Sequence, residues 1–211
     1  MYAVDTEMSH SAITNTNYNT LASQAKLIVT CRFDGVREIT NKSLLSEVKV
    51  EGVIQGDKSL QGKKINVDEP ISIGFENIKQ LYIVNDFKEM VKNFGWQGKS
   101  RVIISSFASA SNLMNYAIMG ENQEYLLFLK PPELLPGQKA DATGYMLLDN
   151  PYAKITISNM NASTYKPPTG EISFKEAMQY EIFLQEPLTI KAYFNTKMEI
   201  LKQLHLISSN N

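Results

Sequence analysis

Several short segments of the chain alternate apolar and polar side chains, and this period of two constrains the fold more than any other feature. In residues 26–33, every second side chain from Leu27 to Phe33 is apolar, so these side chains share one face of an extended strand. Residues 46–55 repeat the pattern with Glu and Lys on the opposite face, which is typical of an antiparallel sheet with one wet face. We predict further strands at residues 63–67, 79–84, 101–107, 124–130, 144–148 and 154–157. The chain is therefore expected to be mainly β.

Prolines set limits to two of these strands. Residues 124–130 form the most apolar of the segments and are expected to lie in the centre of the sheet. Pro131 and Pro132 are expected to end that strand, because proline lacks the N–H that a strand ladder uses. By the same argument, the strand at residues 63–67 is expected to stop near Pro70.

The C-terminal part of the chain changes to a helical period. In residues 188–206, apolar side chains recur at helical spacing with charged side chains between them, which predicts an amphipathic helix packed on the sheet. The expected buried face of this helix consists of Ile190, Phe194, Leu201 and Leu204. A short additional helix is predicted at residues 86–94, and residues 20–25 can form a single helical turn.

Length and composition favour one domain with an N-terminal extension. The chain has 211 residues, of which 43% are hydrophobic and 20% charged, an ordinary composition for a globular protein. Residues 1–20 are polar and poor in large aliphatic side chains, so we expect a flexible polar arm there. Residues 21–211 are expected to form a single domain that includes the C-terminal helix.

Charge and hydropathy bear on the partners and the compartment. The formal net charge is −1, which gives no basic excess, so nucleic acid is not an expected partner. No apolar run approaches the ~20 residues that a membrane helix needs, and no signal peptide follows Met1. Two expectations remain: the protein is cytoplasmic, or an export or anchor segment lies upstream of Met1 and provides its only contact with a membrane.

Residue types that carry catalysis or bind metal are sparse. Cys31 is the single cysteine and lies in an apolar strand, so it is interpreted as a buried free thiol. The two histidines, His10 and His205, lie near opposite ends of the chain and are interpreted as solvated or capping residues. Asp68 and Glu69 are adjacent, so on a strand they point to opposite faces and cannot act as a pair. We therefore predict no catalytic residues, no metal site and no cofactor.

The order of several strand segments resembles a known family. The segments are residues 23–29, 47–56, 62–67 and 123–129. Their pattern resembles that of netrin-like domains with the OB fold, as in the tissue inhibitors of metalloproteinases, and of uncharacterised bacterial surface proteins built on a similar small barrel. The resemblance covers roughly residues 20–150 and implies a five-stranded Greek-key barrel in a location outside the cytoplasm. Those inhibitors act through an N-terminal cysteine that binds a catalytic zinc ion; this chain has no such cysteine, so their activity does not transfer.

Aromatic side chains provide the candidates for binding. Trp96, the only tryptophan, is expected in a glycine-containing loop beside Phe94, and the two residues are the candidate anchor for a protein partner. The alternative is that Trp96 packs on the core. A second aromatic set, expected to pack in the core rather than to stack on bases, consists of Phe33, Tyr125, Phe128 and Tyr145.

These observations leave three functional hypotheses. The first is a non-catalytic binding or interaction module outside the cytoplasm, secreted or anchored at the cell surface, whose partner is another protein or a cell-surface component. The second is an inhibitor or regulator of a partner enzyme such as a protease, acting through a barrel rim or the Trp96 loop. The third is an enzyme whose active-site residues are scattered along the sequence.

Overall fold

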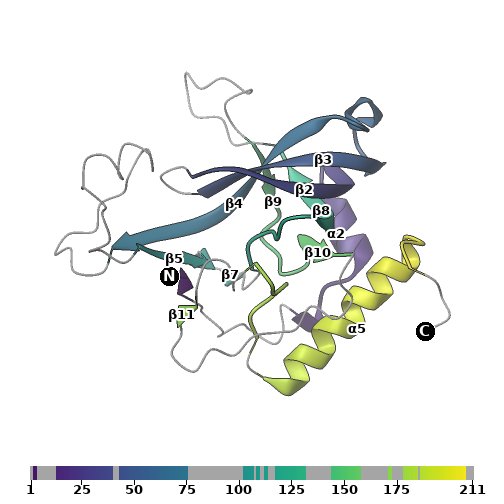
Figure 1. Ribbon diagram of the computed structural model, residues 1–211. Coiled ribbons are helices and arrows are strands. Elements are labelled where there is room, and N and C mark those ends of the chain that lie inside the picture. Colours follow the sequence, from purple (N-terminus) through teal and green to yellow (C-terminus); the bar gives the residue numbers. More distant parts are fainter. Residues whose placement is uncertain are drawn as a thin grey trace.

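The computed structural model describes residues 2–3, 13–39, 43–75, 102–106, 108–109, 112–113, 117–131, 144–157, 171–172, 178–184 and 186–207. The described part is mainly β, as the alternating segments predicted, and it contains a closed barrel and two α-helices (Figure 1). The strand predicted at residues 79–84 and the helix predicted at residues 86–94 lie outside the described residues.

Five strands close the barrel. They are β2 (Leu27–Ile39), β3 (Ser43–Gln55), β4 (Lys64–Phe75), β8 (Gln123–Lys130) and β9 (Tyr145–Leu147). β3 lies between β2 and β4 and is antiparallel to both, while β8 is antiparallel to β2 and β9. β4 and β9 are parallel and close the ring. In chain order the strands therefore run 1-2-3-5-4 around the barrel, which is an OB-like Greek key.

The long strands reach around the barrel because they are irregular. The β2–β3 pairing shifts register at three places, one of them between Thr30 and Cys31. Such bulges bend a strand and increase its twist, as a small barrel requires. Gly52 lies at one of these places, where a Cβ would come 2.8 Å from the Thr30 Oγ1, so the close approach of the two strands depends on glycine.

Shorter strands extend the sheet from the barrel. β10 (Lys154–Thr156) pairs with β8, and β5 (Val102–Ser106) pairs with the second half of β4. The remaining elements are β1 (Tyr2–Ala3), β11 (Glu171–Ile172), β6 (Ala108–Ser109), β7 (Asn112–Leu113) and the 3-10 helix η1 (Lys58–Leu60). β1 pairs with β5 and β11, and β6 pairs with β7.

β4 continues past the proline at which we expected it to stop. Pro70 pairs with Ser43 of β3, and the next residue of β4, Ile71, pairs with β5. Pro70 therefore lies where β4 changes its neighbouring strand, a position at which a missing N–H interrupts the ladder least. The predicted end of this strand was wrong for that reason.

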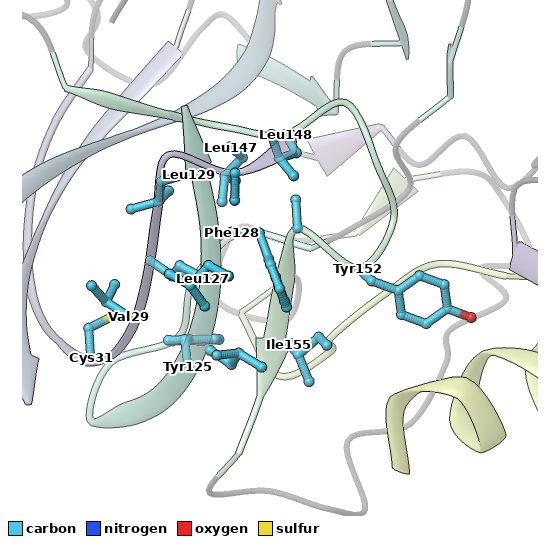
Figure 2. Packing of buried hydrophobic residues seen from close by; sticks show 14 of the residues in the cluster. Val29, Cys31, Tyr125, Leu127, Phe128, Leu129, Leu147, Leu148, Tyr152 and Ile155 are labelled. Carbon is cyan, nitrogen blue, oxygen red and sulfur yellow. The ribbon is translucent and has the colours of Figure 1, made fainter. Parts of the chain in front are cut away.

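The core fills the barrel and continues on its outer side at β8. The alternating side chains from Leu27 to Phe33 are buried, as predicted, and five consecutive residues of β8, from Tyr125 to Leu129, are buried too. β8 has β2, β9 and β10 as neighbours, so its predicted central position is confirmed. Ile155 of β10 pairs with Leu126 of β8, so the side chains of Ile155 and Phe128 share one face of the sheet, and both are labelled in Figure 2.

Part of the predicted N-terminal arm is packed rather than flexible. Ile13 is fully buried, and Tyr18 contacts the Phe128 ring edge-on, with the ring centroids 6.3 Å apart. Tyr18 begins α2 (Tyr18–Gln24), which is capped by the Asn17 side chain accepting a hydrogen bond from the Thr20 N–H at 3.0 Å. The expectation of a flexible arm was therefore wrong for residues 13–20, because its few apolar side chains are enough to dock a capped helix.

The C-terminal helix is present, but its buried face differs from the prediction. α5 (Pro187–Gln203) buries Thr189, Tyr193, Lys197, Ile200 and Leu201. Of the residues that we expected to be buried, only Leu201 is fully buried; Ile190, Phe194 and Leu204 are partly exposed. The buried face is rotated about the helix axis from the predicted one, because the Lys197 ammonium is buried against the Glu181 carboxylate. The spacing of apolar residues cannot indicate a buried ion pair.

Candidate functional site

Five ionisable side chains gather in the interior beside the barrel, and we call them the charge cluster: Arg37, Glu69, Lys154, Glu181 and Lys197. They come from β2, β4, β10, the segment before α5, and α5 itself. All but Arg37 are fully buried, and the Arg37 side chain is only 10% exposed. Burying charge is costly unless each group is paired, so the partners of each group decide what the cluster does.

Glu69 anchors one side of the charge cluster. Its Oε1 accepts hydrogen bonds from the Ser46 hydroxyl at 2.5 Å and from Arg37 at 3.3 Å. Its Oε2 accepts the backbone N–H of Met119 at 2.8 Å. Arg37 also donates to the Met119 carbonyl at 2.8 Å and lies over the Phe33 ring, 4.5 Å from its centroid. Both carboxylate oxygens of Glu69 are thus used within the protein.

Glu181 anchors the other side. Its Oε1 accepts the N–H of Thr156 at 2.8 Å and the Tyr193 hydroxyl at 3.1 Å. Its Oε2 accepts a hydrogen bond from the Lys197 ammonium at 2.5 Å. Glu181 therefore joins β10 to α5, and it satisfies an N–H on the side of β10 away from β8, where none of the other described strands pairs with it.

Lys154 lies between the two carboxylates. Its ammonium donates to the Ala117 carbonyl and is 5.1 Å from the centroid of the Tyr125 ring. Burial lowers the pKa of Lys154 from 10.5 to about 8; the charges of Glu69 and Glu181 oppose this effect only in part. The charge cluster has three cations and two carboxylates, so one positive charge is in excess when Lys154 is protonated.

The charge cluster holds one irregular segment, residues 117–120, against the end of the barrel. All four residues are buried, although they form neither helix nor strand. The Ala117 N–H donates to the Glu181 carbonyl at 2.9 Å, and the Gly120 N–H donates to the Tyr125 hydroxyl at 2.6 Å. Side chains and one backbone carbonyl therefore supply the hydrogen bonds that regular structure would otherwise provide, as a buried backbone requires.

This arrangement is suited to support rather than to chemistry. The hydrogen bonds of Glu69 and Glu181 are to backbone and side-chain groups that fix segments of the chain, and the groups are sealed from water. Among the residues that the structure describes, no three His, Cys, Asp or Glu side chains lie together in a way that could hold a metal ion.

The outer face of the barrel carries an exposed row of charges, which we call the charge ladder: Glu124, Arg32, Lys49 and Lys64. These residues pair in register across β8, β2, β3 and β4. Arg32 forms ion pairs with Glu124 and with Glu51, the second at 3.6 Å. The Lys64 ammonium is 2.6 Å from a Glu47 oxygen, which raises the pKa of Lys64.

Lys49 differs from its neighbours in the charge ladder. It is exposed, it lies directly opposite both Arg32 and Lys64, and it forms no ion pair with another described residue. Like charges directly opposite each other destabilise a sheet. This row could not be predicted from the sequence, because its four members come from strands whose register is visible only in the fold.

The structure places several of the residues singled out from the sequence. Phe33, Tyr125 and Phe128 are buried, and Tyr145 is partly buried against the core, so this aromatic set packs inside the protein. Cys31 is buried, and burial raises the pKa of its thiol well above the ordinary value of 9.0, with smaller effects of the nearby carboxylate charges.

Other predicted positions are either apart from the charge cluster or not described. His205 is exposed just after the end of α5. Asp68 and Glu69 differ in burial, since Glu69 is buried and Asp68 is partly exposed, in agreement with their expected opposite faces. The candidate partner-binding residues Trp96 and Phe94, and also His10, lie outside the described residues.

The comparisons with known proteins leave the chain without an assigned family. No family model, no curated protein and no solved structure matches it. No described helix combines the length and the hydropathy needed to cross a membrane.

Proposed function

We propose that this protein is a non-catalytic binding module that acts outside the cytoplasm and contacts a protein partner through the charge ladder on its barrel. The observation that carries the proposal is the position of Lys49, an exposed cation between two other cations with no ion-pair partner among the described residues. The carboxylates beside it, Glu51 and Glu47, form ion pairs with Arg32 and Lys64, so a carboxylate on a partner protein would supply the ion pair that Lys49 lacks among the described residues.

The charge cluster supports the non-catalytic part of the proposal. Its carboxylates are buried and bound to backbone and side-chain donors, so they are used to hold residues 117–120 and α5. A catalytic acid or base must instead reach a substrate. The location outside the cytoplasm rests on the resemblance of the strand pattern to netrin-like domains and stays a prediction.

A capture experiment with matched charge variants tests the binding surface. The purified protein is immobilised and exposed to the cell-envelope fraction of its source. The test variant is Lys49→Glu with Lys64→Glu. The control variant is Lys26→Glu with Lys191→Glu, two exposed lysines outside the ladder. Each Lys→Glu substitution lowers the net charge by two units, so the net charge of each double variant is four units below that of the wild type.

We expect the wild-type protein and the control variant to retain the same protein, and the ladder variant to lose it at ordinary salt. Equal retention by all three would contradict the proposed surface. If the retained protein is a hydrolase whose activity falls on binding, the module is an inhibitor of that enzyme. Protease treatment of intact cells tests the compartment, because only a protein exposed outside the cytoplasm is cleaved before lysis.

A further inference from the structure

The C-terminal helix combines apolar contacts with a buried ion pair where it attaches to the rest of the molecule. Its buried polar side chains are Thr189 and Lys197. Its apolar contacts with the core come from Tyr193, Ile200 and Leu201, which are buried, and from Ile190, Ala192, Phe194 and Leu204, which are partly buried. A helix that docks on a sheet usually does so through an apolar stripe. The buried Lys197–Glu181 ion pair is therefore the unusual part of the attachment of α5.

The groups that receive α5 lie in connecting segments rather than in the barrel strands. The Tyr193 ring stacks on Tyr152, with centroids 4.8 Å apart and an angle of 9° between the rings. Tyr193 and Lys197 both bind the carboxylate of Glu181, which lies in the segment just before the helix. Figure 1 shows α5 alongside the barrel, and Figure 2 shows Tyr152 set apart from the other labelled core residues, on the side of this helix.

We propose that α5 is a polar latch that opens as one unit while the barrel stays folded. Opening returns the Lys197 ammonium and the Glu181 carboxylate to water, and this restores the hydration that both groups lose when the helix is docked. An apolar interface of the same size gains no such hydration of charged groups when it opens. The free energy of opening is therefore lower than the free energy of unfolding the barrel.

The same ion pair makes the latch all-or-none. A partly docked helix would leave one charge buried without its partner, which is much less favourable than either the docked or the open state. The two states differ in the exposure of Tyr152, which is buried when α5 is docked. The latch gives the protein a second conformation and does not depend on the charge ladder proposed above.

Hydrogen–deuterium exchange on the intact chain tests the latch directly. We expect residues 189–203 to exchange together and at least about 100-fold faster than the amides of β8, with no loss of β8 protection. Exchange of α5 and β8 at one common rate, through unfolding of the whole molecule, would overturn the proposal.

Two variants test the role of the ion pair. Lys197→Met leaves the Glu181 carboxylate buried without its cation, so we expect about tenfold or faster exchange in α5 and unchanged exchange in β8. Adding Glu181→Gln keeps an acceptor oxygen for the Thr156 N–H and removes the unpaired charge, so protection of α5 should return to the wild-type level or exceed it. Lys191→Met, on the exposed side of α5, is the control. Failure of the double variant to restore protection, or equal effects of Lys197→Met and Lys191→Met, would count against the proposal.

Discussion

Replacing Lys154 with Met should remove a pH dependence of stability that this single side chain imposes on the protein. The Lys154 ammonium is buried beside Ala117 and the Tyr125 ring. The two carboxylates of the charge cluster are already paired with Arg37 and Lys197, so Lys154 is the third cation. Burial lowers the pKa of Lys154 to about 8 in the folded state, against 10.5 for an ordinary lysine. The unfolded chain therefore keeps a proton between pH 8 and 10.5 that the folded chain has released.

The sign and size of the effect follow from this difference. Stability rises with pH wherever the unfolded state binds more protons, so the contribution of Lys154 rises between pH 8 and 10.5 and is constant outside that window. The two pKa values differ by 2.5, which at ~1.4 kcal/mol for each pH unit amounts to roughly 3 kcal/mol over the whole window. Most of this change, about 2 kcal/mol, should appear between pH 7 and pH 10.

Urea unfolding followed by circular dichroism measures the effect in wild type and Lys154→Met at pH 7, 8, 9 and 10. The Cys31 thiol has a raised pKa and lowers stability above pH 9, but it does so equally in both proteins and cancels in their difference. We expect the unfolding free energy of the wild type to rise relative to the variant by about 2 kcal/mol across this range. Parallel pH profiles, or a difference of the opposite sign, would refute the account of the charge cluster.

Three further predictions concern other parts of the fold. Cys31 should react with a disulfide reagent at pH 8 at least about 100-fold more slowly in the folded than in the urea-unfolded protein, because its thiol is buried and its pKa is raised; similar rates would contradict its place in the core. Gly120→Ala should destabilise the protein by about 2 kcal/mol or more in urea unfolding, since the new Cβ would lie 2.6 Å from the Met178 carbonyl oxygen. Gly62→Ala, where φ is +79° and the space is open, should cost only about 1 kcal/mol, so equal losses would show that the Gly120 contact is absent. Lys64→Ala should leave the midpoint of urea unfolding nearly unchanged, because its ion pair is exposed, and a clear fall in the midpoint would mean that the ladder is structural.

The strands could be predicted from the sequence because each depends on a local pattern. The alternation from Leu27 to Phe33 and the continuous apolar run around Phe128 indicated both the strands and their buried faces. The cap of α2 also has a local sequence signal. Asn17 is a residue type favoured at the start of a helix, and its side chain accepts a hydrogen bond from the N–H of Thr20, three residues later. The polar composition of residues 13–20 nevertheless favoured a flexible arm, because composition does not show that Ile13 packs in the core.

The charge cluster could not be predicted because its contacts are not local. Glu69 is 32 residues from Arg37 and 50 residues from Met119, and Lys154 is 37 residues from Ala117. In the sequence each of these charged residues looks like an ordinary surface residue. The face of α5 was mispredicted for the same reason, since a buried Lys197 is explained only by Glu181, 16 residues away.

Five strands close into one barrel, and the contact that closes it is the parallel pairing of β4 with β9. Nuclear Overhauser effects between these strands in a labelled sample test this contact directly. We expect cross-strand signals that place Val67 opposite Tyr145 and Asp68 opposite Met146, in a parallel pattern. Signals from β9 to β8 alone, or an antiparallel pattern between β9 and β4, would show that the barrel is open or differently connected.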